Sequence, residues 1–267
     1  MKKYYYLFSV LLILIFTISI INMNRDVNTL QTSGSVELSN KKIEWGIKRN
    51  SNHEQPDLGS INKRIIDEAK GIAMGNTQSK KVHLTFDEGY EAGYTSKILE
   101  VLKQNDVKAT FFITAHYVNT SSDLVQQMID EGHTIGNHTV NHKSMPSLSE
   151  EQIKSEVMAL HQTIYEKFKY EMKYIRPPKG EYSEKTVAYC NTLGYTTVMW
   201  SFAYDDWDEN KQGREDYAKK KILDNIHNGA VILLHGNSKD NANILDYCIK
   251  EIKNMGYEFA SLDDFER

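Results

Sequence analysis

The sequence predicts an α/β protein with a parallel sheet of about seven strands, either closed into a distorted (β/α) barrel or open and doubly wound. The first observation is composition: 267 residues, of which 40% are hydrophobic and 25% charged, are typical of a globular protein with a sizeable core. The second is the alternation, from Lys81 onward, of short β-branched apolar runs with longer amphipathic runs. No repeat or low-complexity segment interrupts this alternation, which favours a single domain.

Each predicted strand is a short apolar run, and helical periodicity fills most of the intervals between strands. The predicted strands are Val82 to Phe86, Ala109 to Thr114, Thr134 to Asn137, Tyr174 to Arg176, Thr196 to Trp200, Ala230 to Leu234 and a short strand near Phe259. The predicted helices are Ala92 to Gln104, Leu124 to Glu131, Glu150 to Tyr170, Glu184 to Leu193, Glu215 to Ile226 and Ile244 to Met255. Ser149 is a helix start signal, whereas Gly194 and Gly256 are typical of helix ends.

The first 25 residues have the pattern of a signal peptide or signal anchor. Lys2 and Lys3 precede an uncharged run of 18 residues, Tyr4 to Ile21, which is long enough to engage a membrane. The positive-inside rule then places the rest of the chain outside the cytoplasm. No small-x-small cleavage site precedes Asn22, which favours an uncleaved anchor over a cleaved signal peptide. A buried N-terminal helix is disfavoured because the run has no polar stripe.

Three further segments follow the leader. Residues 26–44 are rich in Asn, Thr and Ser without apolar periodicity and are interpreted as a linker. Residues 45–80 are predicted to form an N-terminal extension that packs on the barrel, with helical spacing at Ile61, Ile65, Ile66 and Ala69. Residues 81–267 form the main domain.

Charge and cysteine content exclude several classes of protein. The formal net charge is -4, and after residue 25 there are 29 basic against 36 acidic residues, so no nucleic-acid partner is expected. Two cysteines, Cys190 and Cys248, are too few to staple a fold of this size. Both lie in predicted amphipathic helices, which favours two buried thiols over a disulfide bridge.

Polar side chains follow five of the predicted strands. In parallel β/α folds the loops after the strands converge at one face, so these residues are expected to share a site. The motifs are Asp87-Glu88-Gly89, His138 to His142, Arg176 to Gly180, Asp205-Asp206-Trp207 and His235. Each motif alone has an ordinary explanation, such as a helix cap, a rigid turn or a chance pair of histidines. Their joint position at strand ends makes those explanations improbable and predicts an active site.

In chain order, these motifs resemble the five motifs of the polysaccharide deacetylase family, also called the NodB-homology or carbohydrate esterase 4 family. The matching segments are TFDEG (Thr85 to Gly89), HTVNH (His138 to His142), RPPKG (Arg176 to Gly180), Asp206-Trp207 and ILLH (Ile232 to His235). The resemblance covers about Lys80 to the C-terminus. GYEAGYT (Gly89 to Thr95), WSFAYDDWD (Trp200 to Asp208), NAN (Asn241 to Asn243), GYEFASLDD (Gly256 to Asp264) and the Trp45 to Asp57 segment are similar to the δ-lactam-biosynthetic de-N-acetylases of endospore formers.

The resemblance implies a distorted barrel and a role for each motif residue. Asp87 matches the catalytic base, Arg176 the residue that orients it, His235 the general acid, and Asp206 the carboxylate that tunes this acid. Residues expected to contact substrate are Lys179, whose backbone N–H matches an oxyanion donor, and Trp207. The implied metal ligands are Glu88, His138 and His142, with zinc as the expected divalent ion and cobalt or manganese as alternatives. An H-x-x-x-H pair can hold such an ion from one turn.

The implied function is metal-dependent removal of acetyl groups from N-acetylmuramic acid in peptidoglycan glycan strands, by an extracytoplasmic monomer that is either secreted or held at the membrane by its N-terminal segment. Two departures from the family pattern matter. Glu88 stands where the family usually has Asp as third metal ligand, and Ala203 stands where motif four usually has an Asp, which leaves Asp206 or Asp205 as the oriented carboxylate. Because of these departures, a glycan-binding module whose metal site has decayed is an alternative interpretation of this chain.

Two further alternatives are kept. The first is a deacetylase of peptidoglycan N-acetylglucosamine or of chitin-like glycans. The second is a glycoside hydrolase with paired carboxylates such as Asp87 and Asp206, although such an enzyme needs no H-x-x-x-H pair.

Overall fold

The computed structural model describes residues 37–267, and residues 39–267 form one compact unit. The predicted leader, residues 1–25, and most of the predicted linker lie outside the described residues. Among residues 37–267, no helix is long and apolar enough to cross a membrane.

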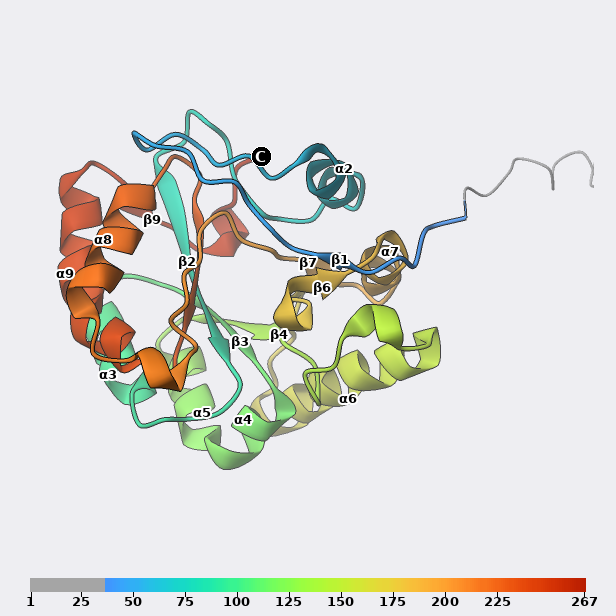
Figure 1. Ribbon diagram of the computed structural model, residues 1–267. Coiled ribbons are helices and arrows are strands. Elements are labelled where there is room, and N and C mark those ends of the chain that lie inside the picture. Colours follow the sequence, from blue (N-terminus) through green and yellow to red (C-terminus); the bar gives the residue numbers. More distant parts are fainter. Residues whose placement is uncertain (1–36) are drawn as a thin grey trace, which may run out of the picture. The chain divides into compact units, whose positions relative to one another are not determined.

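The centre of the unit is a sheet of seven parallel strands, as predicted (Figure 1). Its strand order is β7-β5-β4-β3-β2-β8, with β9 pairing with β2 beyond this path. The neighbours of β2 place the ends of β3 and β8 next to Asp87 and Glu88. The strands are β2 (Lys81–Glu88), β3 (Thr110–Ile113), β4 (Thr134–Asn137), β5 (Tyr174–Ile175), β7 (Thr196–Thr197), β8 (Val231–His235) and β9 (Glu258–Phe259).

The sheet is curled, and the chain after β7 runs from one edge of the sheet toward the other. Val198 still donates a backbone hydrogen bond to Ile175 of β5, at 2.8 Å. Four residues later, Phe202 forms a parallel bridge with Ile232 of β8. The predicted strand Thr196 to Trp200 is therefore regular only over two residues, because the backbone leaves β5 to approach β8. The result is a curled sheet in the form of a distorted half-barrel. A single bridge, Phe202 with Ile232, links the segment after β7 to β8.

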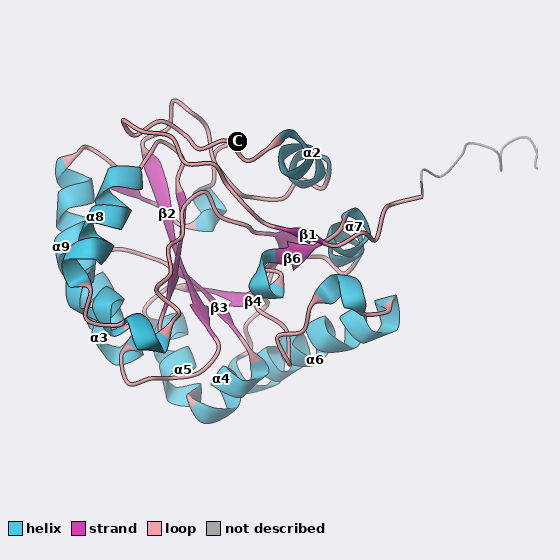
Figure 2. Cartoon of the chain, in the orientation of Figure 1, coloured by secondary structure: helices cyan, strands magenta, loops and turns pink. Residues whose placement is uncertain are grey.

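Helices surround the sheet on its outer side (Figures 1 and 2). Most match the predicted segments, and two differ for local reasons. The α9 helix begins at Lys239, five residues before its predicted start, because the Ser238 side chain accepts a hydrogen bond from the Asn241 backbone N–H. The short α4 helix was not predicted, since six residues are too few to show periodicity. The helices are α3 (Thr95–Gln104), α4 (Ala115–Thr120), α5 (Ser122–Asp130), α6 (Glu150–Phe168), α7 (Glu184–Thr192), α8 (Glu215–Asn225) and α9 (Lys239–Asn254).

The N-terminal segment packs against the α7 side of the barrel. Strand β1 (Ile43–Glu44), in the predicted linker, pairs antiparallel with β6 (Glu181–Tyr182), and helix α2 (Ser60–Glu68) follows. The Trp45 indole donates a hydrogen bond to the Trp200 carbonyl, at 2.9 Å. This small core fixes the loop after β5, which carries part of the site. Its buried members are Trp45, Leu58, Ile65, Ile66, Ala73, Tyr182, Val187 and Met199.

Cys190 and Cys248 are free thiols buried in helices α7 and α9. Burial raises the pKa of each thiol to about 12, so neither is a nucleophile at neutral pH.

Candidate active site

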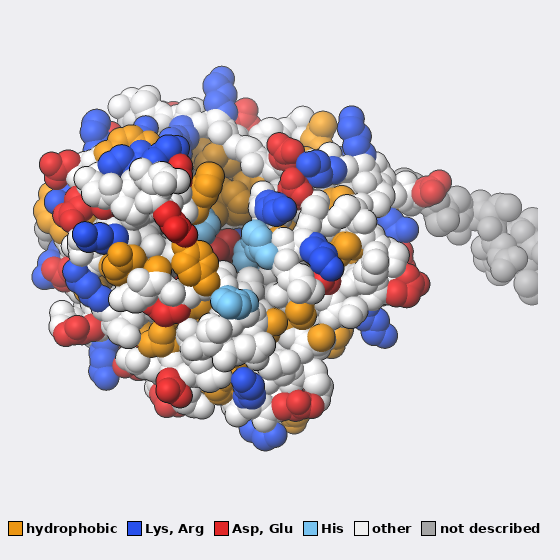
Figure 3. Space-filling view, turned by 60° about the horizontal axis from the view of Figure 1, so that its bottom comes forward, with side chains coloured by type: hydrophobic (Ala, Val, Ile, Leu, Met, Phe, Trp, Pro, Cys, Tyr) orange, Lys and Arg blue, Asp and Glu red, His pale blue; other side chains and the backbone are white. Residues whose placement is uncertain are grey.

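A cavity of about 1010 Å³ opens at the carboxyl ends of the parallel strands. Figure 3 shows it as a hollow lined by histidine side chains, with an acidic side chain deep inside. The sequence-predicted residues that line it are Asp87, His138, His142, Lys179, Trp207 and His235. Arg176 and Asp206 are bonded directly to two of these lining residues. Glu88 is the one predicted site residue in the described chain that takes no part in this arrangement.

Asp87, at the end of β2, is held by Arg176, the largest fully buried side chain in the described chain. Nη1 of Arg176 lies 2.7 Å from Oδ1 of Asp87, and Nη2 donates to the Thr85 hydroxyl at 2.8 Å. The guanidinium also lies over the Phe112 ring, 4.2 Å from its centroid.

Burial alone would raise the pKa of Asp87, but the charge and hydrogen bond of Arg176, with the charge of His235, lower it below its usual range. Asp87 is therefore ionised at neutral pH and able to accept a proton.

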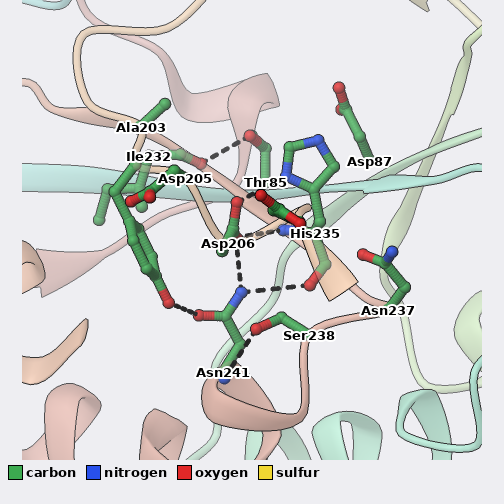
Figure 4. Close-up of polar contacts among 12 residues, drawn as sticks. Thr85, Asp87, Ala203, Asp205, Asp206, Ile232, His235, Asn237, Ser238 and Asn241 are labelled. Atoms are coloured by element: carbon green, nitrogen blue, oxygen red, sulfur yellow. Dashed lines mark hydrogen bonds and ion pairs between the residues drawn. The ribbon is translucent and has the colours of Figure 1, made fainter. Parts of the chain in front are cut away.

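His235, at the end of β8, is paired with Asp206 on the loop after β7 (Figure 4). The two oxygens of Asp206 bond the Nδ1 atom and the backbone N–H of His235, both at 2.8 Å. Burial alone would lower the pKa of His235, but the charge and hydrogen bond of Asp206, with the charge of Asp87, raise it above its usual value. The imidazole thus retains a proton to donate while Asp87 is ionised.

His138 and His142 lie beside Asp87 on the loop after β4. Nδ1 of His138 donates to the Arg176 carbonyl at 2.8 Å, because a carbonyl can only accept. This bond turns Nε2 of His138 toward Nε2 of His142, 3.1 Å away, and toward Oδ2 of Asp87, 3.5 Å away. Burial lowers the pKa of both histidines, that of His142 to about 4, so both are neutral at pH 7.

The backbone of this loop is fixed from α6. Glu156 is buried, and its carboxylate accepts from the Asn141 backbone N–H at 2.7 Å and from the Asn141 amide at 2.8 Å. This clamp supports the left-handed conformations of Thr139 and His142, which have φ values of 68° and 53°.

Glu88 does not join the two histidines. Its side chain is fully buried and lies against Gly236, where an added Cβ would overlap both carboxylate oxygens. Neither oxygen has a hydrogen-bond partner in the described chain. Burial, with the charges of Glu91 and Asp87, raises the pKa of Glu88 well above its usual value. This environment favours the neutral acid form of Glu88, whereas a metal ligand must be ionised.

The residues present do not form the three-ligand metal site that the resemblance implies. Two imidazole nitrogens converge, but no group of three or more His, Cys, Asp or Glu side chains within residues 37–267 is arranged to hold a metal ion. Protein zinc sites ordinarily have three or four protein ligands. The missing ligand is Glu88, since its side chain packs beneath Gly236 instead of facing His138 and His142.

Lys179 and Trp207 both line the cavity, from the loops after β5 and β7. Lys179 and Gly180 both have left-handed backbone conformations, with φ values of 60° and 66°. An added Cβ at residue 180 would come within 2.8 Å of the Trp200 ring, so this tight turn requires glycine. Trp207 is 58% exposed, so its ring is open to solvent at the cavity wall.

Several wall residues were not predicted from the sequence. The Asn237 amide donates to the Tyr90 hydroxyl at 2.8 Å, and this hydroxyl bonds Glu209, so these residues join three loops at the rim. His116, after β3, also lines the cavity. Tyr90 directly follows the motif Asp87-Glu88-Gly89, and Asn237 lies two residues after His235, so both lie just beyond the predicted motifs. Asn241, which donates a hydrogen bond to Asp206, lies in the NAN segment but is not among the predicted site residues.

This arrangement provides a carboxylate base and a protonated imidazole at the same pH, in one cavity. Such a pair can deprotonate water and protonate a leaving group, and these are the two proton transfers that a hydrolase needs.

Comparison with known proteins identifies the family. Residues 74–198 match the family described as polysaccharide deacetylase. The chain is 46% identical over 231 residues to an uncharacterized 30.6 kDa protein in the fumA 3' region of Geobacillus stearothermophilus, covering 86% of this chain and 87% of that one. It is 42% identical over 226 residues to the peptidoglycan-N-acetylmuramic acid deacetylase PdaA of Bacillus subtilis, covering 84% of this chain and 86% of PdaA.

The fold agrees with these sequence matches. The solved structure of Bacillus subtilis PdaA, described as a family 4 carbohydrate esterase, superposes with a TM-score of 0.83 at 41% identity and covers 85% of this chain and 98% of that one. The chain belongs to the polysaccharide deacetylase family, carbohydrate esterase family 4, which confirms the predicted resemblance and the predicted enzyme class, a hydrolase of amide bonds.

Proposed function

We propose that this protein removes the acetyl group from N-acetylmuramic acid in peptidoglycan, outside the cytoplasm. The observation that carries the proposal is the cavity itself, in which the Asp87–Arg176 and His235–Asp206 pairs provide a base and an acid. The 42% identity to a peptidoglycan-N-acetylmuramic acid deacetylase supports the choice of substrate.

In the proposed reaction, Asp87 accepts a proton from a water molecule, whose oxygen adds to the acetyl carbonyl carbon. His235 then donates its proton to the amide nitrogen, and the C–N bond breaks to give acetate and a free amine. The backbone N–H of Lys179 is the proposed donor to the oxyanion that forms between these steps. Relatives in this family generally depend on a divalent metal, and zinc, cobalt or manganese would supply Lewis-acid polarisation of the carbonyl.

The position of Lys179 supports the proposal that the substrate carries a negative charge. Among the described residues that line the cavity, Asp87 is the only acidic one, and Arg176 balances its charge. Lys179 lines the same cavity, close enough for its charge to act on His142, and its ammonium has no ion-pair or hydrogen-bond partner among residues 37–267. It is therefore free to bind the lactyl carboxylate of a muramic residue that no longer carries a stem peptide.

The amine released at C2 would then lie beside the lactyl group at C3. Attack of this amine on the lactyl carboxyl, with loss of water, closes a six-membered lactam, and proximity favours this step over a bimolecular one. We therefore infer a place in the formation of the muramic δ-lactam of spore cortex.

The test compares acetate release from three substrates: peptide-free muramic strands, strands with stem peptides and chitin oligomers. Peptide-free strands should react fastest, and Lys179→Met should raise KM for them about tenfold, equivalent to about 1.4 kcal/mol, with little effect on chitin oligomers. Lys185→Met is the matched control because Lys185 lies outside this cavity, in an exposed ion pair with Glu150. Faster reaction of chitin oligomers would contradict the substrate proposal.

A glycan-binding module with a decayed metal site is the second candidate, and the position of Glu88 favours it. Binding of a sugar alone, however, needs neither a base held by Arg176 nor an acid held by Asp206. Absence of acetate release together with tight glycan binding would support this alternative.

A further inference from the structure

The carboxylate that holds His235 is itself held from helix α9. Asn241, fully buried in the first turn of α9, donates from Nδ2 to Oδ2 of Asp206 at 2.7 Å and to the His235 carbonyl at 3.1 Å (Figure 4). Its Oδ1 atom accepts a hydrogen bond from the Tyr204 hydroxyl at 2.5 Å. One amide thus joins the loop that carries Asp206 to the end of the strand that carries His235.

The chemistry of the partners fixes the direction of each bond. The His235 carbonyl can only accept, so the amide nitrogen of Asn241 must face both it and Asp206. Oδ1 of Asn241 must then face Tyr204, whose hydroxyl has to donate. Burial, followed by the charge of Asp206, raises the pKa of Tyr204 above its usual value, so the hydroxyl stays protonated. The reversed amide would place an oxygen against Asp206.

Asn241 also restricts the rotation of the Asp206 side chain. Oδ2 of Asp206 lies between two donors, the Asn241 amide and the His235 backbone N–H. With Oδ2 fixed at both donors, Oδ1 is directed at Nδ1 of His235. Loss of the amide leaves Oδ2 with the backbone donor alone, and the carboxylate gains freedom to turn.

We propose that Asn241 and Tyr204 are positioning residues, which act through Asp206 to hold the His235 imidazole in place for proton donation. The inference rests on the general-acid role proposed above for His235. Neither side chain needs to touch the reacting atoms. Their function is to keep Oδ1 of Asp206 on Nδ1 of His235, so that Nε2 of His235 carries the proton toward the cavity.

Other charged and titratable groups also shift the pKa of His235, so the test variants must leave these groups unchanged. Asp87 raises the pKa of His235 and Arg176 lowers it, while His138 and His142 couple to it across the cavity. Because burial lowers the pKa of His235, its raised value depends on the Asp206 contact. A less ordered Asp206 should therefore lower the pKa of His235.

The test substitutes Asn241→Leu, which preserves the branched shape and removes every hydrogen bond of the amide. The control is Asn243→Leu, two residues along the same helix, where the exposed amide bonds Glu215 and Lys97, each at 2.7 Å, on the surface. Tyr204→Phe removes only the hydroxyl that orients Asn241, and it decides the question if Asn241→Leu does not fold.

The primary readout is the pKa of the His235 imidazole, measured by NMR in the full chain without substrate. It should fall in Asn241→Leu, fall less in Tyr204→Phe, and stay at the wild-type value in Asn243→Leu. For acetate release, kcat should fall about tenfold in Asn241→Leu and about threefold in Tyr204→Phe, with KM within about twofold. The alkaline limb of the pH–rate profile should move to lower pH.

An unchanged or raised His235 pKa in the folded variants would overturn the proposal. A lower yield of folded protein, with the alkaline limb of the folded fraction at its wild-type position, would overturn it too. The NMR titration needs no turnover. Its failure is therefore distinct from failure of the proposed function, which would appear as absence of acetate release by the wild-type protein.

Discussion

Replacement of Arg176 by Met tests whether a buried charge is what keeps Asp87 ionised. Methionine has similar length but neither charge nor donors, so the variant leaves the Asp87 carboxylate buried without its 2.7 Å partner. It also removes the donors to Thr85, the Val198 carbonyl and the Met199 carbonyl. Removal of one partner of a buried ion pair costs about 3–5 kcal/mol. That loss is a large part of the roughly 5–15 kcal/mol by which domains are stable.

The stability lost in Arg176→Met should depend on pH in a definite direction. In the wild-type protein the pKa of Asp87 is lowered, so its stabilising contribution is present above its unfolded pKa and is lost as pH falls through the folded value. In Arg176→Met, burial dominates and raises the pKa of Asp87, which penalises folding at neutral pH. The difference in unfolding free energy between the two proteins should therefore be largest near pH 7 and shrink in acid. The acid limb of the pH–rate profile should move to higher pH.

Urea unfolding at several pH values measures this difference. Arg64→Met is the control, since Arg64 forms ion pairs with Glu68 and Glu184 at the surface and its loss should change stability little. Asp87→Asn in the Arg176→Met background should regain part of the lost stability because no buried charge remains unpaired. A loss in Arg176→Met that is independent of pH, with no recovery in the double variant, would refute the reasoning.

Three further predictions follow from the site. Asp87→Asn and His235→Ala should each lower turnover about 10²-fold to 10⁴-fold. Asp87→Asn should abolish the acid limb of the pH–rate profile, and His235→Ala the alkaline limb. Near-normal turnover in either variant would exclude the role assigned to that residue. In calorimetric titration with zinc, His142→Ala should weaken binding, because it removes one of the two converging imidazoles. Glu88→Gln should not weaken binding, because Glu88 packs against Gly236 away from the histidines; weaker binding in Glu88→Gln would restore Glu88 as a ligand. Gly236→Ala should lower the melting temperature and the yield of folded protein, because its Cβ would overlap the Glu88 carboxylate; an unchanged melting temperature would contradict this packing.

The sequence predicted the parallel sheet and most helices because alternating apolar runs and helical periodicity report directly on burial. It also predicted which side chains gather, since Asp87, His138, Arg176 and His235 all lie at or after strand ends, which a parallel sheet brings to one edge. The exchange of the chain from β5 to β8 near Phe202 was not predicted, because periodicity does not report strand partners.

The direction of individual side chains was also beyond sequence reasoning. Glu88 was expected to face the histidines, yet its longer side chain is buried beneath Gly236, a contact between residues 148 positions apart in the chain. Asn241 gave no signal of its own, because its role depends on the early start of α9 and on the loop that brings Asp206 to it.

The most direct test of the central claim is the stoichiometry of products from peptide-free N-acetylmuramic strands. The wild-type protein should release one acetate for each new muramic amine or lactam, measured by enzymatic acetate assay and mass spectrometry, while folded Asp87→Asn releases none above background. Release of acetate without a new amine or lactam, or equal release by both proteins, would contradict the account.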